Sequence, residues 1–215
     1  MEEVARIQEE MRGIIKKLNY EGNLQDFFKF LQQDAQFYYP NTSKGKQAYI
    51  NRVEATLDSM QTKLDAFFMT KANQKIRVKA LESFRVESMV ETFFRTSILG
   101  YDTPDIYYLN MENMKKMPKY MMDVMEYKEL LPGHHLQAEI EASLVHLPKF
   151  RRLENAYPAY TEGWAMYAEY LPKEMGAYQD IYSDFGRLTV ELWSACQLVV
   201  DVGIHQKQWT KQEAI

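Results

Sequence analysis

Histidine and glutamate side chains gather in one stretch of the sequence. Three of the four histidines, His134, His135 and His146, lie within thirteen residues, and two of them are adjacent. Glu129 precedes them, and Glu162 follows in a segment of helical character. A catalytic zinc ion usually takes three histidine or carboxylate ligands and a water molecule, whose proton a nearby carboxylate can accept. These residues fit metal-dependent hydrolysis, and a histidine pair held by structural hydrogen bonds fits them as well.

A second group of polar residues lies near the end of the sequence. Gln197, Asp201 and His205 are spaced four residues apart, so they share one face of a helix. Asp201 could orient His205, which suits a residue that stabilises a developing oxyanion. The alternative is a surface ion pair, with His205 favourable at the C-terminal end of its helix.

Aromatic side chains flank Glu162 in the sequence. Tyr160, Trp164 and Tyr167 could line a substrate groove beside that glutamate. Aromatic residues also fill helical cores, so a core position for Trp164 and Tyr167 is an equally good interpretation.

The elements that must position these residues are mainly helical. Apolar residues recur at steps of three and four over 4–18, which predicts an amphipathic helix. Asn23 is a suitable cap for a second helix over 24–31, and a long helix is predicted over 49–67. We find no chemistry in these helices and interpret them as scaffold.

The later part of the chain also has a helical pattern. A helix follows Pro118, and Pro132-Gly133 should break or bend it. A new helix is predicted over 134–145. Thr161 is predicted to cap the next helix, and a last long helix is predicted over 187–204.

Two short strands are predicted in the middle of the chain. Residues 76–80 alternate with a period of two, and residues 105–110 form a second candidate. A turn is predicted over 101–104, and the prolines at 148 and 158 are predicted to bracket a loop.

The predicted fold class is therefore mainly α, a multi-helix domain with a small β element. We expect a single helical domain over 1–215, a length that suits one large domain. Within it, 1–70 is helical scaffold, 71–115 is irregular with short strands, and 116–215 contains the site-bearing helices.

Composition excludes several classes of function. The formal net charge is −4, and the only basic cluster is Lys149–Arg152, so nucleic acid is not expected as a partner. A single cysteine, Cys196, excludes a disulfide framework and a cysteine-rich metal site. No apolar run is long enough to span a bilayer, and the start of the chain lacks the pattern of a signal peptide.

Three ordered segments resemble signatures of the domain-of-unknown-function 885 family. They are Pro132-Gly133-His134-His135-Leu136-Gln137, Glu162-Gly163-Trp164-Ala165-Met166-Tyr167-Ala168-Glu169 and Leu198-Val199-Val200-Asp201-Val202-Gly203-Ile204-His205. Members of this family are mainly helical and similar to gluzincin-type zinc metallopeptidases. Most are much longer and many look exported, so the resemblance implies that this chain is part of a larger family domain, with a preference for the cell envelope. A capping-box sequence, Thr210–Glu213, close to the end of the chain agrees with a longer domain.

The resemblance implies a role for each site residue. Glu129 would be the general base, and His134, His135 and Glu162 would hold zinc beside a small β element at the active-site cleft. Asp201 and His205 would face that cleft.

The sequence departs from the family pattern at Lys128. The family signature usually has histidine there, and a protonated ammonium has no lone pair for a metal. Ser194 and Gln197 stand where arginines are common in the family, which weakens the recognition of a substrate carboxylate.

Three functions therefore stay open. The first is a metal-dependent hydrolase of peptide or related amide bonds, impaired at Lys128. The second is a non-catalytic peptide-binding protein that retains the cleft without metal, in which Lys128 pairs with Glu129 or Glu162. The third is a structural helical module within a larger assembly.

Overall fold

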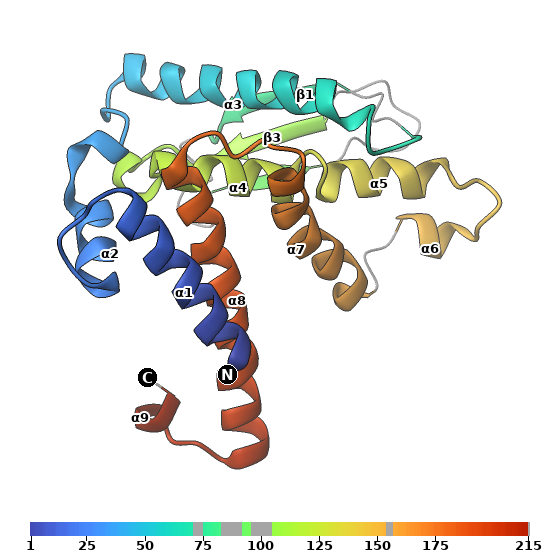
Figure 1. Cartoon of the computed structure of the whole chain (residues 1–215). Coiled ribbons are helices and arrows are strands. Elements are labelled where there is room, and N and C mark those ends of the chain that lie inside the picture. The colour runs from blue at the N-terminus through green and yellow to red at the C-terminus, as the bar shows by residue number, and fades with distance from the viewer. Residues whose placement is uncertain (71–74, 83–91, 96–104, 154–156, 215) are drawn as a thin grey trace.

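The fold is mainly helical, with one small sheet (Figure 1). This computed structural model describes residues 1–70, 75–82, 92–95, 105–153 and 157–214. The described α-helices are α1 (Glu2–Lys17), α2 (Leu24–Gln33), α3 (Ser43–Leu64), α4 (Lys119–Glu129), α5 (His134–Ser143), α6 (Lys149–Leu153), α7 (Pro158–Glu174), α8 (Ile181–Lys207) and α9 (Lys211–Ala214). Short 3-10 turns occupy Ala35–Phe37 and Met114–Lys116.

The sheet has three strands, β1 (Ile76–Ala80), β2 (Thr92–Arg95) and β3 (Asp105–Leu109). Their order is β1-β3-β2, with β3 parallel to β1 and antiparallel to β2. Val78 pairs with Tyr107 in the parallel register. The sheet therefore confirms both strands that the sequence predicted, although the second ends at Leu109 rather than at residue 110.

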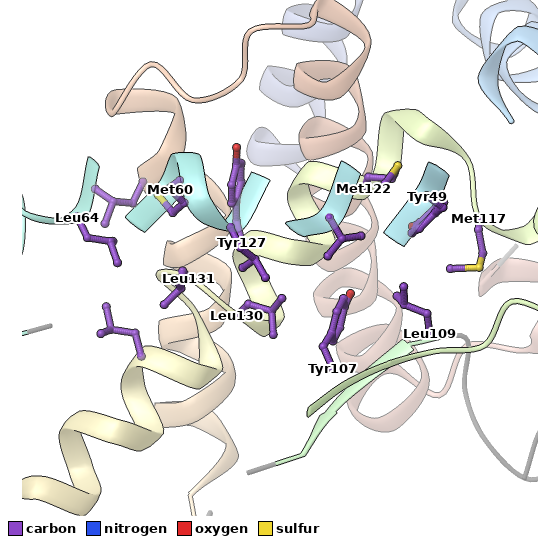
Figure 2. Close-up of a cluster of buried hydrophobic side chains, with 14 of the residues drawn as sticks. Tyr49, Met60, Leu64, Tyr107, Leu109, Met117, Met122, Tyr127, Leu130 and Leu131 are labelled. Carbon is purple, nitrogen blue, oxygen red and sulfur yellow. The ribbon is translucent and has the colours of Figure 1, made fainter. Parts of the chain in front are cut away.

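The larger hydrophobic core joins the sheet to α3 and α4. Figure 2 shows Tyr107 and Leu109 of β3 near Leu130 and Leu131, which follow α4. Tyr49, Met60 and Leu64 of α3 belong to the same buried cluster. Burial of these apolar side chains fixes the end of α4, where the candidate site begins.

A second core joins the N-terminal helices to α8. Phe27 of α2 and Phe185 of α8 are fully buried, and their ring centroids lie 4.8 Å apart. Asn23 caps α2 through a reciprocal capping box with Asp26, as its sequence predicted. This core holds the first part of α8 against α1 and α2 (Figure 1).

Helix α4 crosses α8 at very close range. A Cβ atom built on Gly186 would lie only 1.8 Å from the backbone oxygen of Tyr120, so no larger residue fits there. The two backbones approach closely because glycine has no side chain at that contact.

Several predicted helix boundaries were wrong. Helix α3 ends at Leu64, so Phe67 lies beyond it and is half exposed. The last long helix begins at Ile181 rather than at residue 187, because the side chain of Asp180 caps it by accepting a hydrogen bond from the Tyr182 amide.

The region between the two late prolines also differs from the prediction. Helix α6 lies inside the predicted loop, and α5 ends at Ser143 rather than at residue 145. Thr161 does not cap α7, since that helix begins at Pro158 and contains Thr161 as a buried residue. Proline suits the first helical position, because its missing N–H would be unpaired there. The predicted turn over 101–104 lies outside the described residues.

Candidate functional site

The candidate site forms where the chain breaks between α4 and α5. A Cβ atom on Gly133 would lie 1.7 Å from the backbone oxygen of Lys128, so the break requires glycine. The indole Nε1–H of Trp164 donates a hydrogen bond of 3.0 Å to the backbone oxygen of Pro132. This bond ties α7 to the break, and the break itself is the one that the Pro132-Gly133 pair predicted.

A cluster of charged side chains lies at this junction, and we call it the Lys128 cluster. Lys128 Nζ lies 3.6 Å from Glu162 Oε2 and 3.5 Å from Glu169 Oε1. The second carboxylate oxygen of Glu162 lies 3.6 Å from His134 Nε2. Glu129, the neighbour of Lys128, completes the cluster, because the charges of Lys128 and Glu162 both act on the pKa of its carboxyl group.

Burial shifts the proton affinities of three members of the Lys128 cluster. Burial raises the pKa of Glu169 to about 7, against the opposing effect of Lys128. Burial likewise raises the pKa of Glu129 to about 7, with Lys128 opposing and Glu162 adding to the rise. Burial lowers the pKa of His134, although Glu162 favours its charged form. The cluster therefore holds two carboxyl groups that exchange protons near neutral pH.

His135 faces a different environment from its neighbour His134. Its side chain is fully buried, and its Nδ1 lies 2.8 Å from Oδ2 of Asp105 at the start of β3. Its Nε2 lies 3.8 Å from Glu139 Oε2, one turn along α5. Consecutive helical residues point about 100° apart, so only His134 of the pair reaches Glu162.

Of the aromatic residues around Glu162, Trp164 is partly buried, whereas Tyr160 and Tyr167 are exposed. Trp164 contacts Phe68 edge-on at a centroid distance of 6.1 Å and lies 5.9 Å from the Tyr167 ring. With its hydrogen bond to Pro132, Trp164 joins α7 to neighbouring segments. Tyr160 is 61% exposed and Tyr167 is 47% exposed, so both are accessible to a ligand.

Asp201 and His205 meet each other on α8. His205 Nε2 lies 3.6 Å from Asp201 Oδ1, and both side chains are more than two-thirds exposed. Figure 1 shows that the last turns of α8 extend away from α4 and α5. Within the described part of the chain no contact joins this pair to the Lys128 cluster, and its assignment to the cleft stays a prediction.

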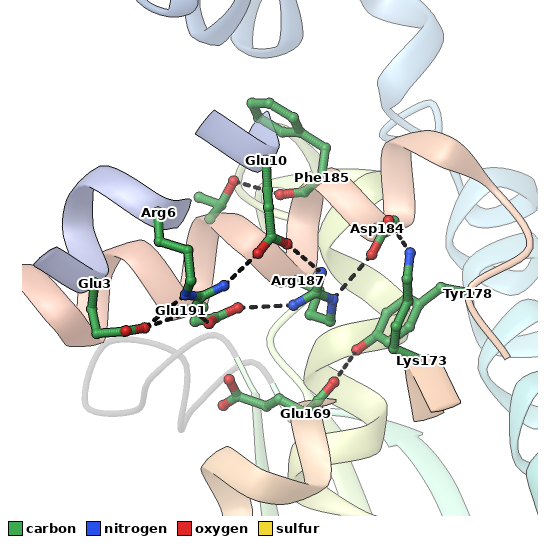
Figure 3. Close-up of polar contacts among 11 residues, drawn as sticks. Glu3, Arg6, Glu10, Glu169, Lys173, Tyr178, Asp184, Phe185, Arg187 and Glu191 are labelled. Carbon is green, nitrogen blue, oxygen red and sulfur yellow. Dashed lines mark hydrogen bonds and ion pairs between the residues drawn. The ribbon is translucent and has the colours of Figure 1, made fainter. Parts of the chain in front are cut away.

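The end of α7 is held by a network that centres on Arg187 (Figure 3). The buried guanidinium of Arg187 donates to Asp184 at 3.0 Å and to Glu191 at 2.8 Å. The hydroxyl of Tyr178 donates to the backbone oxygen of Glu169 at 2.7 Å. The bond from Tyr178 therefore holds the backbone at Glu169, the residue whose side chain meets Lys128.

These residues do not fit the zinc ion that the family resemblance implies. Lys128 places an ammonium against Glu162, the one carboxylate among the implied ligands, and His135 turns toward Asp105. In the part of the chain that the structure describes, no group of three or more His, Cys, Asp or Glu side chains is placed to hold a metal ion. We therefore assign no chemical step to a metal.

Sequence reasoning missed Glu169 and two partners of His135. Glu169 follows Glu162 by seven residues, close to two helical turns, so their spacing alone indicates a common face. Glu139 follows His135 by four residues, and that spacing was also informative. Asp105 comes from a distant strand, and no local pattern links it to α5.

No described helix is both long enough and apolar enough to cross a membrane.

Comparisons with known proteins agree on the fold. The putative lipoprotein from Colwellia psychrerythraea matches with a TM-score of 0.92 and 32% sequence identity, covering 99% of this chain and 37% of that one. A putative lipoprotein of unknown function from Shewanella oneidensis matches with a TM-score of 0.64 and 16% identity, covering 98% of this chain and 40% of that one. This chain thus spans well under half the length of both proteins.

No curated protein matches the chain. One family model, described as bacterial protein of unknown function (DUF885), matches residues 1–215. The chain therefore belongs to the DUF885 family of bacterial proteins.

Proposed function

We propose that this protein is a non-catalytic, metal-free member of its family that binds peptides or small amides. The observation that supports this most directly is the position of Lys128, whose ammonium lies within 3.6 Å of both Glu162 and Glu169. The ammonium supplies the positive charge that the two carboxylates require, and it does so without a metal ion.

The energetics favour lysine over a bound dication in this arrangement. Two unit charges about 4 Å apart interact by roughly 4 kcal/mol at an effective dielectric near 20. A divalent ion between Glu162 and Glu169 would be repelled by the Lys128 ammonium with about twice that energy at the same distance. Either the ammonium must move away from both carboxylates or the ion must bind elsewhere.

The surface around the Lys128 cluster is suited to a peptide. Glu162 remains about half exposed beside His134, so it can accept hydrogen bonds from backbone amides. Tyr167 and Met166 are exposed on the same helix and offer apolar contact to side chains. An envelope location is part of the proposal, because the Colwellia psychrerythraea relative is described as a putative lipoprotein.

A retention experiment tests the proposal. A tryptic digest of casein is incubated with the purified protein in EDTA, and retained peptides are identified by mass spectrometry. We expect a defined subset of peptides to be retained uncleaved. Retention should fall in Glu162→Gln, which loses a carboxylate, and persist in Glu174→Gln, an exposed change on the same helix. Loss of retention in EDTA, or zinc-dependent cleavage of the digest, would refute a metal-free binding protein.

A gluzincin-like, metal-dependent amide hydrolase is the second candidate. The observation in its favour is the pKa of Glu129, which burial raises to about 7. A general base works best with a pKa near the working pH. In this case Lys128 would have to leave Glu162 and Glu169, and its replacement by histidine should increase activity.

A further inference from the structure

A pocket separate from the Lys128 cluster lies between α5, α6 and α7. Its volume is about 290 Å³, at the lower end of ligand pockets, which run from about 300 to 1,000 Å³. Leu144, Leu147 and Phe150 form an apolar wall, and Tyr157 and Tyr160 form an aromatic one. A pocket of this size and lining admits one side chain or a small molecule with an apolar stem.

Hydrogen bonds from Arg152 hold the loop between α5 and α6 that forms one wall of the pocket. The guanidinium of Arg152 donates to the backbone oxygen of Ala142 at 2.8 Å and to that of Leu147 at 3.2 Å. These bonds hold Leu144 and Leu147 in place before any ligand arrives. Preorganisation of this kind reduces the entropy that binding would otherwise cost.

One carboxylate in the pocket lacks a full set of partners. Oε1 of Glu141 is buried and makes no hydrogen bond to any described residue. Tyr160 favours the charged form of Glu141, yet burial outweighs that effect and raises the pKa of Glu141. Burial of a carboxylate without a cation is unfavourable, so a positively charged partner would relieve the cost.

The other charged residue of the pocket, Arg151, is exposed. An exposed charge is screened by water and salt, whereas a partly buried one is screened much less. Of these two lining charges, Glu141 is therefore the less screened. Tyr157 and Tyr160 add the negative faces of their rings, which attract cations.

We infer that this pocket binds an organic cation, a primary ammonium on an aliphatic stem. The stem lies along Leu144, Leu147 and Phe150, and the ammonium pairs with Glu141 between the tyrosine rings. A lysine side chain of a peptide and a free alkylamine share this chemistry. The inference uses none of the residues of the Lys128 cluster, so it stands or falls independently of the proposed function.

Three probes with five carbon atoms each test the charge preference. Pentylammonium, 1-pentanol and pentanoate are titrated into the full chain, and binding is followed by amide chemical shifts of α5 and α6. We expect pentylammonium to bind at least tenfold more tightly than the other two. Equal binding of 1-pentanol, or a preference for pentanoate, would overturn the inference.

Three variants locate the effect. Glu141→Gln should weaken pentylammonium binding by about tenfold or more, since it removes a charge-assisted hydrogen bond. Arg151→Gln should strengthen binding about threefold, because a repelling charge leaves the rim. Glu174→Gln, outside the pocket, should have no effect. Because Arg151 is exposed, Arg151→Gln should fold and keeps the test decisive if Glu141→Gln does not fold. Weaker pentylammonium binding in Arg151→Gln would contradict the inference that the pocket binds a cation.

A further titration separates the two sources of the ammonium. The blocked peptide acetyl-Gly-Lys-Gly-amide binds more tightly than pentylammonium if the pocket recognises lysine within a peptide. The reverse order supports a free amine, and failure of both to bind overturns the inference.

Discussion

The Lys128 ammonium and the Glu169 carboxylate lie 3.5 Å apart, although one residue belongs to α4 and the other to α7. Glu169 is almost fully buried, so this contact lies in a region of weak screening. It joins the break after α4 to the helix that also presents Glu162. The contact defines the chemistry of the site, because it puts a fixed positive charge between two carboxylates.

The first prediction concerns the pH dependence of stability. Glu169 has a pKa of about 7 in the folded chain, raised from the ordinary value of 4.5. Between pH 4.5 and about pH 7, the native state therefore keeps a proton on Glu169 that the unfolded chain has lost. The contribution of Glu169 to the free energy of unfolding is therefore full below pH 4.5 and falls as pH rises to about 7. The fall is on the order of 3 kcal/mol.

Glu169→Gln removes this titration. The loss of stability between about pH 5 and about pH 8, measured by urea denaturation, should become smaller in the variant by up to that amount. Glu174→Gln, an exposed change in the same helix, should keep the pH dependence of the parent. An identical slope in Glu169→Gln and the parent would show that Glu169 is not the titrating group.

A pair of glycine substitutions tests the close packing of α8 against α4, with Gly163 of α7 as the comparison position. Gly186→Ala should destabilise the chain by about 3 kcal/mol or more, because its Cβ would meet the Tyr120 backbone at 1.8 Å. Gly163→Ala should stabilise it by up to about 1 kcal/mol, since nothing lies within 4 Å of that Cβ and alanine favours helix. Thermal melting of both variants checks this, and equal effects would contradict the close approach of α4 and α8.

The hydrogen bond that fastens α7 to the chain break gives a third prediction. Trp164→Phe keeps an aromatic ring near Phe68 but leaves the backbone oxygen of Pro132 without its donor. We expect a loss of about 1 to 2 kcal/mol in the free energy of unfolding. Trp193→Phe is the matched control, because Trp193 is 61% exposed and should change stability little. Equal losses in the two variants would show that the bond to Pro132 contributes nothing.

Much of the fold could be predicted from local patterns. The cap at Asn23, the strand at 76–80 and the break at Pro132-Gly133 each depend on a few neighbouring residues, and the structure confirms all three. The start of α7 was missed because Thr161 resembles a cap, while the proline that begins the helix was interpreted as the end of a loop. Boundaries depend on competing local signals, so they are the weaker part of such predictions.

The candidate site was only partly accessible from the sequence. The motif placed His134 and Glu162 in one site, and the structure brings them within 3.6 Å. It did not reveal that His135 turns to Asp105, because that contact depends on how β3 packs against α5. The pairing of Lys128 with Glu169 likewise depends on the crossing of α4 and α7.

The central claim is that the Lys128 ammonium takes the place of a metal ion, and zinc affinity tests it most directly. Calorimetry on purified, untagged protein should show no stoichiometric zinc binding for the parent chain. Lys128→His should bind one zinc ion at least a hundredfold more tightly. The substitution removes the ammonium that repels the ion and adds an imidazole ligand beside His134 and Glu162. Adding His134→Ala to this variant should abolish the gain. Tight stoichiometric zinc binding by the parent chain that His134→Ala removes would contradict the account and favour the metal-dependent hydrolase.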